Sequence, residues 1–431
     1  MLRRRAVLAL AGGLAAPALL RAQAERDADI IVIGAGAAGI SAARHLVDAG
    51  RSVIVLEARD RVGGRAWTTE TALGLAWDAG AQWLHNAARN PFVTLAQEAG
   101  RALVYSDFED MRIASDLQNA GFDDLWRGFT GLYRRIDRAD RMGRSDHVLA
   151  DLNIDDPWQQ AARRLTALSM GGDPDEITVA EANNQESGDD LLVEGGFGRL
   201  VADLAHGLPV RLNTRVRQID LRAPDHVLVS GSFGSLKSRA VLVTAPASVL
   251  ATGAIEMAPG WPAWKRAAWQ ALPSGDVLKL GLRLRARPLD APEYAIDLSA
   301  LDAGQGALIH LHPQAPLATL LIAGAYARDL LQAGPAAIAQ AGRTALAQAL
   351  GAGAAGQVTD VAWHDWVSDP LSLGAYSRAR PGAEDARIDA MAPVQDRVFF
   401  AGEAAPGPMA TTVGGAWLSG QQAARAVAQM L

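Results

Sequence analysis

The sequence contains no cysteine among its 431 residues. This absence excludes disulfide bridges, thiolate metal sites and cysteine nucleophiles in any compartment, and we expect no metal centre. Beyond the N-terminus there is also no apolar run long enough to cross a bilayer, no internal repeat and no long low-complexity linker. Hydrophobic residues make up 49% and charged residues 20%, which is typical of a globular protein. The length suits two intertwined domains.

The N-terminus has the features of an export signal. Arginines at positions 3–5 precede an apolar run over residues 6–20, and residues 22–24 (AQA) are typical of a signal-peptidase site. The run is shorter than the roughly 20 residues of a membrane span, which favours a cleaved signal over an uncleaved anchor. Paired arginines favour the twin-arginine route over the Sec route. We therefore expect residues 1–24 to be a signal peptide and the mature protein to be periplasmic or secreted.

The charge balance gives a weak indication about partners. Without residues 1–24 the chain has 37 basic and 47 acidic side chains, a net charge of about −10. This acidity does not suggest nucleic-acid binding, and it weakly favours cationic substrates through electrostatic steering.

Residues 29–57 predict a dinucleotide-binding βαβ unit. The apolar stretch 29–33 (DIIVI) predicts a buried parallel strand, which leads into GAGAAG at 34–39 and then into a helix. The stretch 52–56 (SVIVL) predicts a second strand that ends at Glu57, where a carboxylate can accept hydrogen bonds from ribose hydroxyls. Strand, glycines, helix, second strand and acid occur in the required order. The alternative, an ordinary tight turn between strand and helix, does not require the acid.

Each glycine of this motif has a separate task. Gly34 permits the tight turn, Gly36 lets the backbone approach a pyrophosphate, and Gly39 lets the helix pack on the strand. The helix N-terminus, which includes Ala38, offers free amides and a positive dipole end to the phosphates.

The rest of the chain is predicted more coarsely. Residues 91–175 have a mostly helical pattern, and a helix is expected from the EGGFG stretch (194–198) to about residue 206. Alternation over 277–326 predicts an antiparallel sheet, and the Ala- and Gln-rich stretch 334–350 predicts a surface helix. Further strands are expected at 210–221, 226–229, 240–244 and 398–401, and a last helix at 414–430.

The segment after Glu57 has a recognisable signature. Residues 58–68 (ARDRVGGRAWT) resemble the second motif of glutathione-reductase-like flavoproteins, specifically the flavin-containing amine oxidase superfamily. The resemblance implies that FAD is the cofactor and that Ala58, Arg59, Gly64 and Arg65 lie along it. A Gly-Gly-Arg turn can place backbone amides and a guanidinium beside phosphate. The alternative is a basic surface loop.

The resemblance extends over most of the mature chain. The loop 80–85 (GAQWLH) is similar to the family's loop beside the flavin ring, which implies cofactor contacts for Ala81, Gln82 and Trp83. Residues 399–404 (FFAGEA) and 411–420 (TTVGGAWLSG) are similar to its C-terminal flavin signature. The remaining contacts that the resemblance implies are Val216 at the adenine, Gly402 and Glu403 near the ribityl–phosphate stretch, and Thr412 and Val413 at the flavin pyrimidine.

The family's reaction implies few acid–base residues. A hydride passes from the amine-bearing carbon to flavin N5, the imine is hydrolysed, and oxygen reoxidises the flavin to give hydrogen peroxide. Lys279 interrupts an apolar strand and resembles the lysine that the family holds through water at N5, where it could assist oxygen reduction or position the hydrolytic water. There we expect its pKa to be lowered. The alternative is a strand-end lysine that reaches solvent.

Aromatic residues are expected around the amine. In WVSDPLSLGAYS (366–377), the resemblance implies that Trp366 packs on the flavin and that Tyr376 lines the approach of the amine. Ordinary core aromatics are the alternative. Ala375 replaces the cysteine that attaches FAD in some monoamine oxidases, so noncovalent FAD is expected. Thr412 replaces their second cage tyrosine, a pattern closer to polyamine oxidases and histone lysine demethylases, although the chain has no room for the demethylases' helical tower.

The loop 80–85 bears on the substrate. It contains no arginine, whereas amino-acid oxidases of the superfamily tend to carry one that holds the substrate carboxylate. Trp83, His85 and Tyr376 are the candidate substrate contacts, and His85 either meets a second amino group or caps a loop. We expect oxidation of a polyamine or another primary or secondary amine. The other readings are an L-amino-acid oxidase and a flavin-bound protein without turnover.

Together these features predict an α/β fold, with a Rossmann-like FAD-binding domain of glutathione-reductase type interleaved with a substrate-binding domain of mixed sheet and helices. The FAD-binding domain is expected to comprise residues 27–90, 191–250 and 377–431, and the substrate-binding domain residues 91–190 and 251–376. The pattern predicts no oligomeric state.

Overall fold

The computed structural model describes residues 26–114, 121–184, 188–288, 290–298, 305–383 and 385–431. The predicted signal peptide, residues 1–24, lies outside the described residues. Within them, no helix combines the length and the apolar character that a bilayer span requires.

A five-stranded parallel sheet carries the predicted βαβ unit. Its central strand β1 is buried throughout, with Ile31 and Ile33 in one hydrophobic core and Ile30 and Val32 in another. Successive side chains of a strand point to opposite faces, so this sheet is covered on both faces and its strands are apolar throughout. The order β20-β13-β1-β2-β9 joins β20 (Val398–Phe400), β13 (Ala240–Val243), β1 (Ile30–Ile33), β2 (Val53–Leu56) and β9 (Val210–Arg211).

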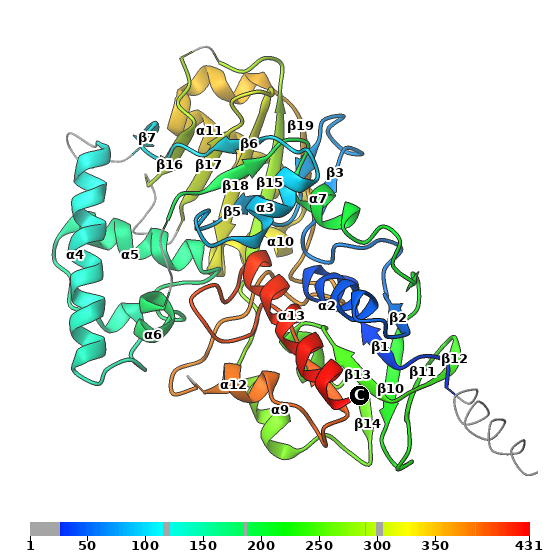
Figure 1. Cartoon of the computed structure of the whole chain (residues 1–431). Helices are drawn as coiled ribbons and strands as arrows, with labels where there is room; N and C mark the ends of the chain where they lie inside the picture. Colours follow the sequence, from blue (N-terminus) through cyan, green and yellow to red (C-terminus); the bar gives the residue numbers. More distant parts are fainter. Residues whose placement is uncertain (1–25, 115–120, 185–187, 289, 299–304, 384) are drawn as a thin grey trace, which may run out of the picture.

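Two helices from opposite ends of the chain cover one face of this sheet. The predicted helices are confirmed as α2 (Ala37–Asp48) and α13 (Val413–Met430), which lie side by side (Figure 1). Ser41 donates a hydrogen bond to the Trp417 carbonyl at 2.8 Å. A Cβ on Gly420 would lie 2.2 Å from the Ala38 carbonyl oxygen, so glycine is what permits this close approach.

The other face is covered by a second sheet and three short helices. Trp261, Trp269 and Phe400 form an aromatic group in this core, with ring centroids 5.0–6.0 Å apart. Residues 255–272 therefore pack with the parallel sheet. The predicted boundary at residue 250 assigns them to the substrate-binding domain, and the domain boundaries stay predictions. The sheet comprises β12 (Gly234–Ser238), β11 (Val227–Gly231), β10 (Val216–Asp220) and β14 (Glu256–Ala258), and the helices are α8 (Ala247–Ala251), α9 (Ala263–Gln270) and α12 (Ala386–Met391).

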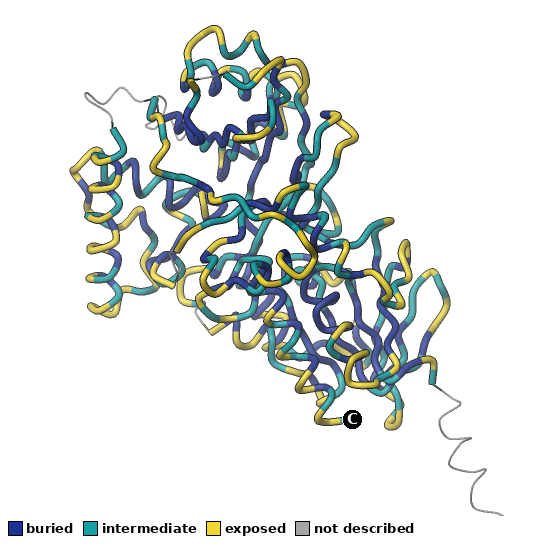
Figure 2. The backbone as a smooth tube through the Cα atoms, turned by 45° about the horizontal axis from the view of Figure 1, so that its top comes forward, coloured by how far each residue is buried: buried dark blue, intermediate teal, exposed yellow. Residues whose placement is uncertain are grey.

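The predicted antiparallel sheet is confirmed as the centre of a six-stranded sheet. The order is β19 (Val358–Trp363), β15 (Val277–Leu284), β18 (Leu317–Ala323), β17 (Ala307–Leu311), β16 (Tyr294–Asp297) and β7 (Met111–Ala114), with only β16 and β7 parallel. Helices α10 (Gly324–Ala333) and α11 (Pro335–Leu350) pack with it. Figure 2 shows buried backbone running through both large sheets.

The region 91–175 is only partly helical. Helix α3 (Pro91–Glu98) is followed by the strands β6 (Leu103–Tyr105) and β7, and then by α4 (Phe122–Arg141), η1 (Leu149–Asp151), α5 (Pro157–Ser169) and, just beyond the region, α6 (Val179–Asn183). The two strands pair with distant segments, β8 (Leu191–Val193) and β16, so their pairing leaves no local periodic pattern. Helices α4, α5 and α6 form the flank seen at the left of Figure 1.

Short elements line the region between the sheets. Strands β3 (Thr68–Thr69) and β4 (Trp77–Asp78) pair with each other, and β5 (Trp83–Leu84) pairs with β8. Helix α7 (Phe197–Asp203) ends earlier than the predicted residue 206, and η3 (Ala352–Gln357) follows α11.

Candidate active site

Two glycine turns meet at the carboxyl end of β1. Gly34 has φ +104°, a value that favours glycine, and a Cβ on Gly39 would lie 1.9 Å from the Gly34 carbonyl oxygen. The second turn, at Gly63 and Gly64, is joined to the first by an isolated β-bridge, in which the Gly63 amide donates to the Ala35 carbonyl at 2.8 Å. A Cβ on Gly64 would lie 3.3 Å from the Gly36 Cα. The two turns therefore approach each other at positions where glycine leaves no side chain between them.

The N-terminus of α2 is prepared for an anion. Its N-cap residue, Gly36, provides no side-chain hydrogen bond to the first turn, and Ala38 is the second residue of the helix. Free amides and the positive end of the helix dipole at such a terminus bind phosphate groups. This arrangement fits the pyrophosphate of a dinucleotide.

Glu57 is buried at the end of β2, with 6% of its surface exposed. Its Oε2 accepts a hydrogen bond from the Ala35 amide at 2.7 Å, and its Oε1 accepts one from the Arg59 amide at 2.8 Å. Each carboxylate oxygen keeps a further lone pair, which fits the acceptance of ribose hydroxyls. The Glu57 carbonyl also binds the amide of Thr214, two residues before Val216 at the start of β10. The structure thus brings Val216 to the same end of the sheet as Glu57.

The Arg59 guanidinium faces an aromatic group, whereas its amide faces Glu57. It pairs with the Asp369 carboxylate at 2.7 Å, and its Cζ lies 5.8 Å from the centroid of the Trp366 ring. Trp366 is 4% exposed and donates from Nε1 to the Ala79 carbonyl at 2.9 Å. The tryptophan is therefore fixed next to the loop 80–85. Ala58 lies between Glu57 and Arg59 and is half-buried.

Arg65 and Glu403 form an ion pair across the chain. Arg65 Nη1 lies 3.0 Å from Glu403 Oε1 and also donates to the Ala375 carbonyl. Burial raises the pKa of the Glu403 carboxyl, but Arg65, Ser377 and Arg387 outweigh it and hold that pKa below its ordinary value. A narrow cavity lies beside this pair, at the carboxyl ends of β13 and β20, and Gly402 also lines it. Ligands of parallel α/β sheets bind at such strand ends.

The loop 80–85 is held by three strands of the six-stranded sheet. The Gly80 carbonyl accepts from Lys279 Nζ at 2.8 Å, Gln82 Nε2 lies 2.9 Å from His310 Nδ1, and Trp83 Nε1 donates to the Tyr294 hydroxyl at 2.7 Å. Gln82 is 2% exposed, so its side chain is turned into the sheet. The Gln82 carboxamide is therefore held against His310 of the sheet.

Lys279 does not reach solvent. It is the third of the eight residues of β15 and has 5% of its surface exposed. Its Nζ is 5.4 Å from the centroid of the Trp83 ring, and burial lowers its pKa to about 7. The charge of Asp78 opposes this shift in the Lys279 pKa. The expected lowered pKa is confirmed, and the alternative of a solvent-reaching lysine is excluded.

Two histidines near the loop 80–85 have pKa values shifted in opposite directions. Burial lowers the pKa of His310 to about 3, so its imidazole is neutral. His85 lies 2.9 Å from Asp190 and is open on one side, with 51% of its side chain exposed. Burial lowers the pKa of His85, but the hydrogen bond and charge of Asp190 outweigh it and raise that pKa above its ordinary value.

Tyr376 is anchored at both ends of its side chain. Its hydroxyl donates to the Ser169 carbonyl at 2.6 Å, and its ring packs against Val277 and Gly171. Val277 and Lys279 point to the same face of β15 because side chains alternate along a strand. Tyr376 and Lys279 therefore border the same side of the sheet.

Thr412 is the N-cap of α13. Its hydroxyl accepts from the Gly415 amide at 2.9 Å and donates to the Met409 carbonyl at 2.7 Å, and Val413 is the first helical residue. The preceding Thr411 has φ +69°, an uncommon conformation for a β-branched residue, and its amide donates to the Glu403 carbonyl at 2.8 Å. The C-terminal signature thus places a helix N-terminus beside Glu403.

Several groups around this site are absent from the sequence prediction. Asp78 accepts hydrogen bonds from Thr68 and from the amides of Phe197 and Gly198, which joins β3, β4 and α7. Its place two residues before Gly80 was a signal that could have drawn attention to it. His310 lies in an otherwise apolar strand, as Lys279 does, so a search for polar residues within apolar strands could have found it.

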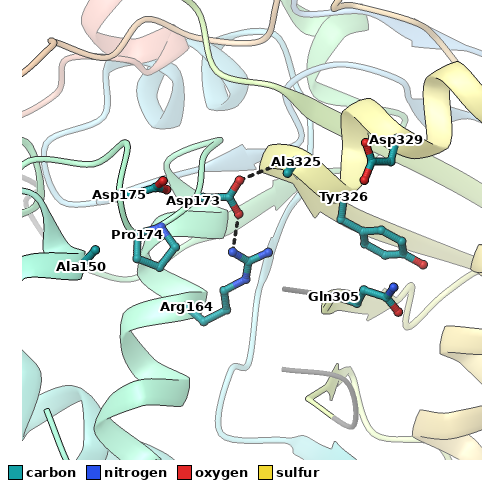
Figure 3. A pocket seen from close by; sticks show the side chains of 9 residues that line it. All are labelled: Ala150, Arg164, Asp173, Pro174, Asp175, Gln305, Ala325, Tyr326 and Asp329. Atoms are coloured by element: carbon teal, nitrogen blue, oxygen red, sulfur yellow. Dashed lines mark hydrogen bonds and ion pairs between the residues drawn. The ribbon is translucent and has the colours of Figure 1, made fainter. Parts of the chain in front are cut away.

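A separate hollow of about 410 Å³ lies at the start of α10 and shares no lining residue with this site (Figure 3). Figure 3 shows the Asp173 carboxylate between Arg164 and the backbone of Ala325, whose amide donates to it at 2.7 Å. Asp173 therefore caps α10, and we assign no ligand to this hollow.

Comparison with known proteins places the chain. The profile of the family "Flavin containing amine oxidoreductase" matches residues 37–138 and 141–428. The chain is 26% identical to a probable polyamine oxidase 4 of Arabidopsis thaliana, covering 94% of this chain and 88% of that protein. It is 27% identical to a lysine-specific histone demethylase 1 homolog 3 of the same plant, covering 93% of this chain but only 30% of that protein's length.

A solved structure has the same fold. Cyclohexylamine oxidase from Brevibacterium oxydans superimposes with a TM-score of 0.80 over 94% of this chain and 99% of that chain, at 22% identity. The predicted α/β fold class is confirmed by this likeness.

Proposed function

The chain belongs to the flavin-containing amine oxidoreductase family, and from this premise we propose that it is an FAD-dependent oxidase of polyamines or related primary and secondary amines. The proposed products are an imine, which water hydrolyses to an aldehyde and an amine or ammonia, and hydrogen peroxide from oxygen. The observation that carries the proposal is the buried Lys279, whose Nζ donates to the Gly80 carbonyl of the loop predicted to lie beside the flavin ring.

FAD, when bound, supplies the acceptor for the hydride that leaves the amine-bearing carbon. The residues of the chain bind the cofactor, orient the amine and exclude water. Gly36, Gly64 and the N-terminus of α2 would hold the pyrophosphate, Glu57 would accept hydrogen bonds from the ribose, and Arg65 and Glu403 would lie along the ribityl stretch. Trp83 and Tyr376 guide an amine, since aromatic faces attract cations and pack against alkyl chains.

The preference for amines over amino acids rests on the charges of the loop 80–85. No arginine there can hold a substrate carboxylate, and the nearby carboxylate of Asp190 is half-buried beside His85. Because Asp190 is paired with His85, the distinction rests on the missing arginine, without which a substrate carboxylate lacks a guanidinium partner in this loop. This supports a polyamine over an amino acid.

The proposal also includes a noncovalent cofactor and export. Ala375 precedes Tyr376 and offers no thiol for attachment of the flavin. The arginines at 3–5 and the AQA sequence at 22–24 support cleavage and passage to the periplasm or exterior. Denaturation in trichloroacetic acid should release all the flavin into solution, and N-terminal sequencing of the exported protein should begin at residue 25; a flavin that stays with the pellet would contradict noncovalent binding.

Anaerobic titration tests the activity. Spermidine, putrescine, cyclohexylamine and the free L-amino acids are each added to the oxidised holoprotein, and bleaching of the visible flavin absorbance is followed. We expect polyamines to bleach it and amino acids to leave it unchanged. Bleaching by amino acids alone would indicate an L-amino-acid oxidase, and no bleaching by any compound would indicate a flavin-bound protein without turnover. Admission of oxygen should then restore the colour and release hydrogen peroxide.

A further inference from the structure

The three-residue segment that carries Tyr376 is held by two guanidinium groups. On one side, Arg65 donates to the Ala375 carbonyl. On the other side, Arg387 of α12 donates to the Ser377 hydroxyl at 2.9 Å and to the Ser377 carbonyl at 3.1 Å. Arg65 belongs to the predicted flavin motif, whereas no motif in the sequence pointed to Arg387.

Arg387 is a buried charge with a matching counter-charge. It is 4% exposed, and it binds both carboxylate oxygens of Glu181, from Nε at 3.0 Å and from Nη2 at 2.6 Å. This bidentate geometry is the strong form of the arginine–carboxylate pair. Glu181 lies on α6, so the pair joins the helical flank to the C-terminal part of the chain.

The network continues from Arg387 to Glu403. The Ser377 hydroxyl, which accepts from Arg387, donates to Glu403 Oε2 at 2.7 Å, and the Ser377 amide donates to the same oxygen at 3.1 Å. The other oxygen of Glu403 is the one paired with Arg65. Glu181, Arg387, Ser377, Glu403 and Arg65 therefore form one continuous chain of hydrogen bonds and ion pairs.

We propose that Arg387 is a positioning residue that sets both Glu403 at the cofactor and Tyr376 at the amine, with Glu181 as the counter-charge that permits its burial. The amine part of this inference rests on the proposed function, whereas the cofactor part requires only that the chain binds FAD. Rigid support of this kind matters because small displacements of binding groups weaken oriented contacts.

The chain offers a matched control in Arg378. Its side chain is 12% exposed and binds both oxygens of Glu176, at 2.8 Å from Nη1 and 3.1 Å from Nη2, so it joins the same two regions through a second arginine–glutamate pair. Among the hydrogen bonds of the described residues, its side chain makes none to Ser377 or Glu403. Loss of either arginine removes a half-buried or buried ion pair, but only the loss of Arg387 opens the network to Glu403.

The test compares Arg387→Met with Arg378→Met. We expect Arg387→Met to weaken FAD binding by about tenfold or more, the size typical of a lost charge-assisted contact, and to slow anaerobic flavin reduction at saturating amine by a similar factor. Arg387→Lys, which keeps the charge but not the fork, should recover part of both. Arg378→Met should change both by less than about twofold while losing comparable thermal stability. Equal FAD affinity in the two methionine variants would overturn the proposal.

Ser377→Ala provides the test if Arg387→Met does not fold. This change removes the hydroxyl bridge to Glu403 and leaves the Arg387–Glu181 pair in place, and we expect several-fold weaker FAD binding and an altered flavin absorption spectrum. Unchanged affinity and spectrum would overturn the proposal. Because FAD affinity is measured without amine, an absence of amine oxidation would overturn the proposed function without affecting this result.

Discussion

The chain contains only three lysines, and two of them, Lys265 and Lys279, are buried in different parts of the molecule. Lys265 lies on α9, in the core beside the parallel sheet, and Lys279 lies on β15 of the six-stranded sheet. Burial lowers the pKa of each to about 7, and one nearby acid opposes the shift in each case, Asp389 for Lys265 and Asp78 for Lys279. Their burial and pKa values alone do not distinguish them.

Their hydrogen bonds distinguish them. The Lys265 ammonium donates to the carbonyls of Asp389, Ala390 and Ala392 at the end of α12, and its Nζ lies 3.6 Å from the centroid of the Phe400 ring. All three of its N–H groups have partners. Within the described residues Lys279 makes one hydrogen bond, to Gly80, which leaves donors for a ligand or water.

A lowered pKa therefore identifies a functional lysine only when the amine also has unused hydrogen-bonding capacity. A lysine whose donors are all satisfied by carbonyls at a helix C-terminus stabilises that terminus. A lysine with spare donors in a polar, aromatic site is available for chemistry. We therefore assign a structural role to Lys265 and propose a catalytic role for Lys279.

Lys279→Met should produce the largest functional effect. We expect amine-dependent hydrogen peroxide production to fall by about 10²-fold, within the range for loss of a positioned acid–base group, while FAD remains bound. Stopped-flow reduction and reoxidation of the flavin would assign the loss to one half-reaction. Turnover within threefold of that of the unmodified enzyme would contradict a catalytic role for Lys279.

Lys265→Met should produce the largest effect on stability. Three carbonyls at the end of α12 lose the lysine as donor, and the Asp389 carbonyl keeps the Ala392 amide. Each carbonyl left unsatisfied costs about 1–3 kcal/mol, partly offset by removal of a buried charge. We expect the free energy of unfolding to fall by about 2–4 kcal/mol in urea denaturation, with turnover of the remaining holoenzyme within about threefold. A loss below about 1 kcal/mol would contradict the structural role.

The pH dependence of reoxidation should separate the two roles considered for Lys279. With a pKa of about 7, Lys279 is charged below pH 7 and neutral above it. If the cation assists oxygen reduction, the reoxidation rate falls as pH rises through about 7, and this dependence is absent in Lys279→Met. A rate that rises with pH through this range would instead indicate that neutral lysine positions water. A flat profile in the unmodified enzyme would contradict both roles.

Asp389→Asn should produce the smallest effect. Asp389 raises the pKa of Lys265 through its charge, but its side chain is exposed and its backbone carbonyl is retained in the variant. Exposed charges contribute little, so we expect a change in unfolding free energy below about 0.5 kcal/mol. A larger stability change in Asp389→Asn than in Lys265→Met would contradict the structural role assigned to the Lys265 ammonium.

Asp78→Asn should lower the pH midpoint of flavin reoxidation, because it removes a buried charge that favours protonated Lys279.

The dinucleotide half of the site could be predicted from the sequence because its parts are consecutive. The GAGAAG motif, Glu57 and the Gly63–Gly64 turn lie within about 30 residues, and each has a local conformational reason, such as φ +104° at Gly34. Val398–Phe400 and α13 could be predicted for the same reason, from a short apolar strand and a helical repeat.

The part of the site around the flavin ring and the amine could be predicted only through the family resemblance, or not at all. The strands β6 and β7 and the contacts of Gln82 with His310 and of Arg387 with Glu181 join residues far apart in the chain, and no local pattern encodes them. The roles of individual site residues stay predictions until the variants are measured.

By itself, the sequence determined the local elements of the cofactor site, since glycine conformation, apolar runs and a strand-end acid act over short distances. It also determined the absence of thiol chemistry, since no cysteine is present. Only the tertiary structure decided which buried lysine has spare donors, which arginine reaches Glu403 through Ser377, and that the Gln82 side chain is buried against His310. Burial and hydrogen-bond saturation depend on what the rest of the chain places around a group, so a residue's neighbours in sequence cannot specify them.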